Sequence, residues 1–131
     1  MSLNNHGLPS RVPVIAEMGR MLADPQVPEA DKQLALELLV QDHADLDEVE
    51  VQSALWAISQ MGTSAAACDA LLACAPAWLA HADAAPLFLD AYSAVGGSPL
   101  RPGAAAAFAQ LQVLAGKDAE LAARLQHTAR P

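Results

Sequence analysis

Basic residues are scarce in this chain, and one long stretch has none. The sequence carries seven Lys and Arg against 15 Asp and Glu, a formal net charge of −8. Between Lys32 and Arg101 no Lys or Arg occurs. Proteins that bind DNA or RNA neutralise phosphates with basic side chains, and anionic membranes attract basic segments in the same way. We therefore expect neither a nucleic-acid partner nor a membrane partner.

Long apolar runs are absent as well. No segment reaches the roughly 18 uninterrupted apolar residues of a membrane span, and the N-terminus lacks the charged start and apolar run of a signal peptide. The sequence therefore predicts a cytoplasmic protein. Its two cysteines, Cys68 and Cys74, fall about 240° apart around one expected helix and cannot readily pair with each other. We expect both to be reduced and buried.

Aromatic and β-branched residues are few, whereas alanine and leucine dominate the hydrophobic 53% of the chain. Alanine and straight-chain residues lose the least entropy in a helix, so the composition favours an all-α fold. A chain of 131 residues can bury one sizeable core but not two. We expect a flexible tail over residues 1–9 and a single all-helical domain over residues 10–131.

Glycine and proline divide this domain into seven expected helices. Gly62 is expected to end the third helix in a left-handed conformation, and Thr63 or Ser64 to cap the fourth. Because proline lacks a backbone N–H and clashes with the preceding turn, we expect a break or kink at Pro76, followed by a separate turn or short helix over 76–82. The expected helices cover approximately residues 10–23, 28–44, 46–61, 64–75, 86–95, 103–115 and 118–128.

These helices pair into three antiparallel hairpins and a closing helix, about 35 to 40 residues apart, a spacing typical of helical repeats. Large and small residues recur around each turn glycine. The positions are Ile58, Gly62, Ala67, Leu71 and Cys74 in one unit, and Tyr92, Gly96, Ala104, Phe108 and Leu111 in the next. Over about residues 47–115 this pattern resembles the tetratricopeptide (TPR) hairpin. The early Trp-Leu-Gly part of the TPR motif is missing, and a compact helical bundle or a HEAT-like array is the alternative.

Among TPR-like proteins, the small size, acidity and three degenerate hairpins are most similar to the cytosolic chaperones that hold the needle subunit of type III secretion systems. The resemblance implies a non-catalytic chaperone or adaptor with a concave groove that keeps an aggregation-prone secreted helix monomeric. The expected partner is a protein or peptide, helical in form, and both homo- and hetero-oligomers remain open.

Counting back from Gly62 places one face of the third helix in the core and another on the groove. The core positions are Val51, Ala54, Leu55 and Ile58. The expected partner-binding residues are Gln52, Trp56, Ser59, Gln60, Asp90 and Ser93. For Trp56 the alternative is a buried core position in an ordinary bundle.

The densest polar cluster is the stretch QDHADLDEVE, residues 41–50. Its histidine and carboxylates could hold a divalent cation, but the stretch lacks the central glycine of an EF-hand loop. We interpret it as a solvated turn whose acids favour the start of the third helix. The chain also lacks a nucleophile elbow, a phosphate loop and a dinucleotide fingerprint. We therefore expect no catalytic residue, no metal and no cofactor.

A second class of function fits the acidity. Small acidic helical proteins also serve as immunity proteins, which neutralise a toxin by covering its active site. The salt dependence of binding separates the two classes. Binding in an apolar groove should change little with salt concentration, whereas the association rate of an acidic face with a basic enzyme should fall steeply as the salt concentration rises.

Overall fold

The computed structural model describes residues 10–129, which contain seven α-helices, two short 3-10 helices and no strand. The expected tail over residues 1–9 lies outside this range. The 3-10 helices are η1 (His43–Asp45) and η2 (Ala82–Ala84). The α-helices are α1 (Val12–Ala23), α2 (Glu29–Asp42), α3 (Glu48–Ser59), α4 (Ala65–Trp78), α5 (Ala85–Ala94), α6 (Ala104–Ala115) and α7 (Ala119–Ala129).

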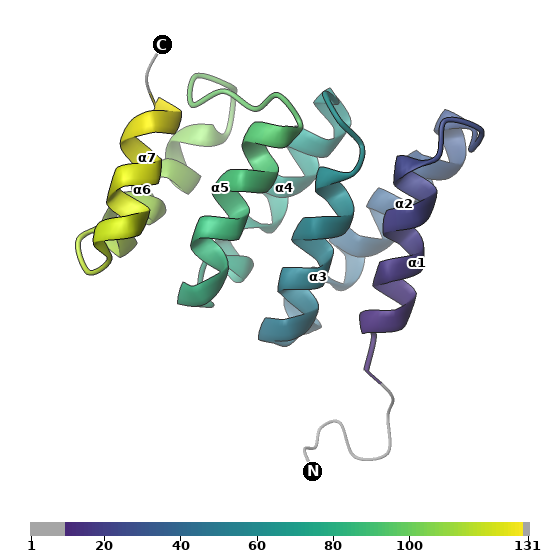
Figure 1. Ribbon diagram of the computed structural model, residues 1–131, viewed down its shortest axis with the longest axis horizontal. Helices are drawn as coiled ribbons and strands as arrows, with labels where there is room; N and C mark the ends of the chain where they lie inside the picture. The colour runs from purple at the N-terminus through teal and green to yellow at the C-terminus, as the bar shows by residue number, and fades with distance from the viewer. Residues whose placement is uncertain (1–9, 130–131) are drawn as a thin grey trace.

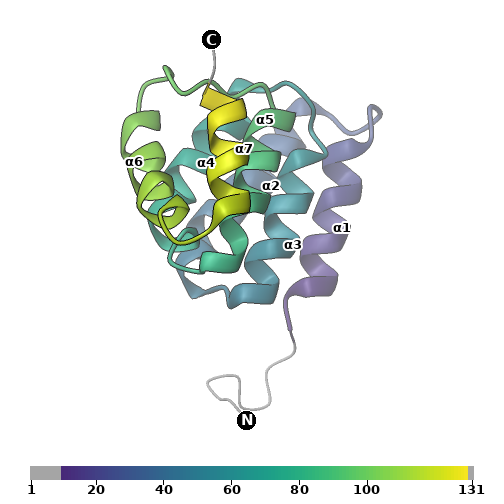
Figure 2. The same ribbon diagram turned by 60° about the vertical axis from the view of Figure 1, so that its left-hand side comes forward.

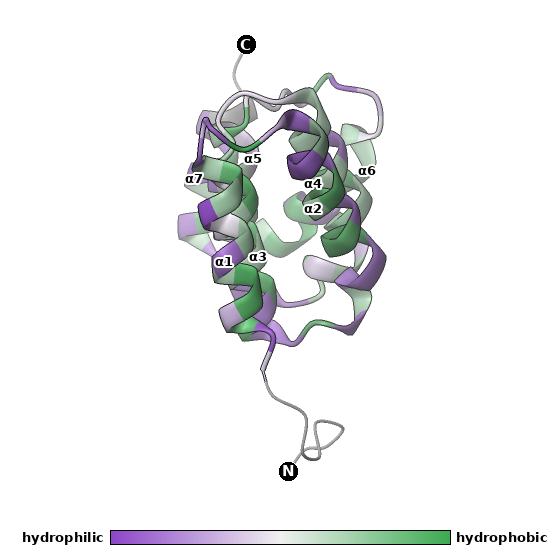
Figure 3. Cartoon of the chain, turned by 90° about the vertical axis from the view of Figure 1, so that its right-hand side faces the viewer, coloured by the Kyte–Doolittle hydropathy of each residue, from purple (hydrophilic) through white to green (hydrophobic). Residues whose placement is uncertain are grey.

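The helices pack in two layers. In Figure 1, α1, α3, α5 and α7 lie side by side in the layer nearer the viewer, and α2, α4 and α6 form the layer behind. Figure 3, seen from the α1 end, shows the two layers next to each other. Figure 2 shows α7 closing the C-terminal end against α5 and α6. The all-α prediction of three stacked hairpins and a closing helix is confirmed.

The core runs between the layers along the whole stack. The four residues of α3 that were expected to face neighbouring helices are all buried: Val51, Ala54, Leu55 and Ile58. Cys68 and Cys74 are free and buried on α4, as expected, and burial raises the pKa of the Cys74 thiol to about 12. A thiol held in its neutral form in this way behaves as a small apolar side chain.

Local signals in the sequence set several helix ends. Gly62 has φ +69° and turns the chain after α3, a conformation that favours glycine because it has no Cβ. The Ser64 hydroxyl accepts a hydrogen bond from the backbone N–H of Ala67 at 3.1 Å and caps α4. α1 begins slightly later than expected, with Arg11 as its N-cap residue.

The expected break at Pro76 is wrong. α4 continues through Pro76 and ends at Trp78, whose side chain is fully buried. The indole Nε1 of Trp78 donates to the backbone oxygen of His43 at 2.9 Å. A proline inside a helix costs about 3 kcal/mol, whereas burying the 150–250 Å² of a tryptophan contributes roughly 4 to 6 kcal/mol. The helix therefore continues because its last turn brings Trp78 into the core.

Tyr92 is the only tyrosine in the sequence, which makes its titration directly measurable. Its ring lies against Phe88 and Phe108, with centroids 6.1 and 5.9 Å away, and its hydroxyl donates to the Ser98 carbonyl oxygen at 2.6 Å. Burial raises the pKa of the Tyr92 phenol.

We expect an absorbance titration of the folded protein to give a tyrosine pKa above the ordinary value of about 10, and the urea-unfolded chain to return to it. The neutral phenol is favoured in the folded state, so its contribution to stability is complete below about pH 10. That contribution is lost as the pH rises from there through the folded-state pKa. Equal pKa values in the folded and unfolded chains would contradict this expectation.

Candidate partner-binding groove

A groove lies between α3 and α5, which are neighbours in the front layer of Figure 1. We call it the α3–α5 groove; its volume is about 310 Å³. The residues that line it are Gln52, Leu55, Trp56 and Ser59 from α3, and Leu87, Asp90, Ala91 and Ala94 from α5. Apolar side chains from both helices thus form most of the lining, and three polar side chains lie among them.

Trp56 is the largest side chain of this groove, and it is 47% exposed. The inner edge of its ring rests on α1 at Gly19, where a Cβ atom would overlap the ring. The buried Gly19 therefore leaves room for the indole between α1 and the groove. The alternative placement of Trp56 in the core is wrong, and the fully buried tryptophan is Trp78.

Four of the six expected partner-binding residues line the α3–α5 groove, and two do not. Gln52, Trp56, Ser59 and Asp90 lie together there. Gln60 instead turns back along α3, where its Nε2 donates to the Trp56 carbonyl oxygen at 3.3 Å. The last of the six, on α5, is Ser93, which is exposed but outside the lining.

Asp90 is the only charged residue of the groove lining, and its carboxylate forms an ion pair with Arg124 of α7. The Arg124 guanidinium donates to the Asp90 carboxylate at 2.6 Å and to Glu120 at 3.1 Å. All three side chains are more than a third exposed, and exposed ion pairs of this kind contribute at most about 1 kcal/mol. A basic group on a bound partner could therefore replace Arg124 at Asp90 with little loss of stability.

Of the four residues that α5 contributes to the groove, only Asp90 was expected from the sequence. Leu87, Ala91 and Ala94 recur at the i, i+4, i+7 spacing that places residues on one helix face. That spacing identifies a face but does not say which helix it meets. The neighbour is set by the stacking of α5 on α3, which only the structure shows.

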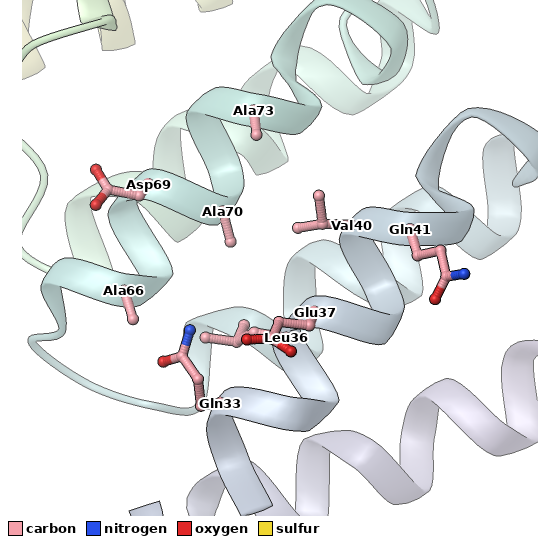
Figure 4. Close-up of a pocket in the computed structure, with 9 residues that line it drawn as sticks. All are labelled: Gln33, Leu36, Glu37, Val40, Gln41, Ala66, Asp69, Ala70 and Ala73. Carbon is pink, nitrogen blue, oxygen red and sulfur yellow. The ribbon is translucent and has the colours of Figure 1, made fainter. Parts of the chain in front are cut away.

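A second groove lies in the other layer, between α2 and α4, with a volume of about 630 Å³ (Figure 4). The residues that α4 turns toward it include three alanines, Ala66, Ala70 and Ala73, whose short side chains leave the space between the helices open. Its rim carries Asp69, which is ion-paired with Arg101 at 3.0 Å. This groove has no exposed aromatic residue among its lining.

In the acidic stretch from residue 42 to 50 the three aspartates are exposed and Glu48 is half-buried, whereas Glu50 is buried. Glu50 is only 8% exposed, so the expectation of solvated acids is wrong there. Its carboxylate accepts hydrogen bonds from the backbone N–H groups of Asp47, at 3.0 Å, and Arg11, at 2.7 Å. The signal in the sequence is the Asp47-x-x-Glu50 spacing, an aspartate version of the capping box that begins α3.

Residues 10–129 hold neither a metal-binding cluster nor a membrane-spanning helix. No group of three or more His, Cys, Asp or Glu side chains lies close enough together to hold a metal ion. No helix of that range has the length and apolar character needed to cross a bilayer.

Comparison with known proteins finds no relative of this chain. No family model matches the chain, and neither the curated proteins nor the solved structures contain a match. The TPR-like resemblance therefore rests on the residues of this sequence alone.

Proposed function

We propose that this chain is a non-catalytic binding module whose α3–α5 groove holds a helical segment of a protein partner. The observation that carries the proposal is Trp56, a tryptophan 47% exposed at a groove with apolar walls. Tryptophan offers a large contact area with few rotatable bonds and is enriched among the residues that dominate binding energy.

The chemistry of the groove defines the partner. Leu87, Ala91 and Ala94 form an apolar strip along α5, opposite Trp56 and Leu55. An amphipathic helix can lay its apolar face into such a groove. Since Asp90 is the groove's single charge, a basic residue at the edge of the bound helix is favoured.

The specific form that we propose is a cytoplasmic chaperone for an aggregation-prone helix, as the similarity to needle-subunit chaperones implies. Two buried free thiols suit a reducing compartment. Both helices of the groove lie in the stretch without Lys or Arg, which argues against nucleic acid as the ligand.

The test is site-specific photocrosslinking in the native host. We expect a photoreactive residue at Gln52, inside the groove, to yield one discrete adduct, and the adduct to be lost when Trp56→Ala is added. The matched control is the same residue at Val113 on α6, which is 70% exposed and outside the groove. Absence of an adduct from Gln52, or the same adduct from both positions, would contradict the proposal.

The immunity-protein alternative is favoured by one observation, the net charge of −8 combined with the long stretch that lacks basic residues. The association rate of the identified partner separates the two functions. A helix held by apolar burial should associate at nearly the same rate between about 50 and 500 mM NaCl. A fall of more than about tenfold would indicate an acidic face that meets a basic enzyme.

A further inference from the structure

The two ends of the helical stack differ in chemistry. At the C-terminal end, α7 closes the stack and carries polar residues such as Glu120 and Arg124 on its exposed sides. At the N-terminal end, the outer side of the α1–α2 hairpin is a hollow of about 240 Å³. Repeat proteins that end in water need a polar outer face on the terminal unit. The outer face of the first hairpin is instead partly apolar, because Val14 and Leu38 are exposed on it.

Eight residues line the hollow of the N-terminal end face, and three of them, Ile15, Leu39 and Leu46, are buried. The other five are Arg11, the N-cap residue of α1, Val14 and Met18 on α1, and Leu38 and Asp42 on α2. Val14 is 58% exposed and Leu38 is 43% exposed. Figure 3 looks onto this end of the stack. Inside the stack, a comparable apolar face of each hairpin is covered by the next hairpin, so the end face is suited to a further pair of antiparallel helices.

We propose that the N-terminal end face binds the same face of a second copy of this chain, about a two-fold axis parallel to α1 and α2. Arg11 begins α1 and Asp42 ends α2, so in the antiparallel hairpin both lie at the same end of the face. The axis places α1 of one copy over α2 of the other. Each Arg11 then faces Asp42 of the second copy, and each Val14 faces Leu38.

Charge complementarity is the reason for assigning a second copy to this face. Among the described residues, the ion pairs involve neither the Arg11 guanidinium nor the Asp42 carboxylate. The two-fold axis forms two equivalent ion pairs beside an apolar centre, and such self-complementarity is what a symmetric interface requires. The lining of the α3–α5 groove carries only a negative charge, from Asp90, and cannot pair with itself. The end face and the α3–α5 groove share no lining residue, so the dimer does not depend on the proposed function.

The size of the face indicates a reversible dimer. Two helices of 12 and 14 residues give a face about 20 Å long and about 20 Å wide. The resulting footprint of roughly 400 Å² on each copy lies at the low end for specific interfaces, where association is weak. The dimer should accordingly be populated in proportion to protein concentration.

Sedimentation equilibrium between about 5 and 500 μM tests this interface by charge reversal. We expect the wild-type chain to dimerise progressively, and Arg11→Glu or Asp42→Arg alone to weaken the dimer at least about tenfold, because each puts like charges opposite each other twice. Mixing the two variants should restore association, because every acid in the mixed dimer again faces a base. Both side chains are exposed, and Arg11→Glu keeps the backbone N–H that donates to Glu50.

Matched apolar substitutions complete the experiment. Val14→Glu on the end face should leave a monomer, whereas Val113→Glu on α6, also highly exposed, should leave the dimer unchanged. A wild-type chain that stays monomeric at 500 μM would overturn the proposal. So would single charge reversals without effect, or a mixture that fails to associate.

Discussion

Trp78→Ala should lower the free energy of unfolding by about 3 to 5 kcal/mol, whereas Trp56→Ala should lower it by about 1 to 2 kcal/mol. Trp78 is fully buried at the end of α4, so its removal leaves a cavity in the core. The truncation also leaves the His43 carbonyl oxygen without its 2.9 Å donor. Both losses act in the folded state and add to each other.

Trp56 differs because half of its surface is already in water. Truncating it removes the contact with Gly19 and part of the groove lining, but it opens no closed cavity. Urea unfolding followed by far-ultraviolet circular dichroism measures both variants without relying on tryptophan fluorescence. A loss of 3 to 5 kcal/mol for Trp56→Ala would show that the side chain is structural and would remove it from the proposed binding surface.

The helical architecture was predictable because its signals are local. Gly62 and Ser64 define the turn between α3 and α4 through backbone conformation and a single cap, and neither depends on distant residues. The regular interval between helix pairs then predicts a stack. The same counting placed Val51 and Ile58 in the core, where the structure has them.

The prediction of a break at Pro76 was wrong because it counted the cost of a proline inside a helix but not the burial of Trp78, which offsets that cost. The proline cost is a property of the chain segment, but the burial of Trp78 depends on η1, more than thirty residues earlier in the sequence. Helix continuation is therefore decided by a contact that periodicity cannot reveal.

Three of the four groove residues on α3 were predicted from the sequence, but only Asp90 of the four on α5. Positions on α3 follow from Gly62, which is next to that helix in sequence. Gln60 and Ser93 were assigned to the groove from helix position alone. Gln60 is the C-cap residue of α3 and hydrogen-bonds back to Trp56, and Ser93 is exposed outside the lining. The exposure of Trp56 could not be predicted from α3 alone, because Gly19 on α1 makes room for its ring.

Glu50→Ala should cost at least about 3 kcal/mol, although the aspartates of the same acidic stretch are exposed. Its carboxylate satisfies the backbone N–H groups of Asp47 and Arg11, which are the N-cap residues of α3 and α1. Hydrogen bonds to a charged group contribute about 1.5 to 3 kcal/mol each, and their loss leaves donors without a protein acceptor. One side chain thus joins the starts of two helices that are 39 residues apart in sequence.

Glu48→Ala is the matched control, since Glu48 lies in the same first turn of α3 and favours it only through the helix dipole, worth about 0.3 to 1 kcal/mol. Thermal or urea unfolding should separate the two variants. Amide hydrogen exchange gives a local readout, because α1 should lose protection in Glu50→Ala while α5 keeps it. If Glu50→Ala were no more destabilising than Glu48→Ala, the carboxylate would not be what attaches α1 to the stack.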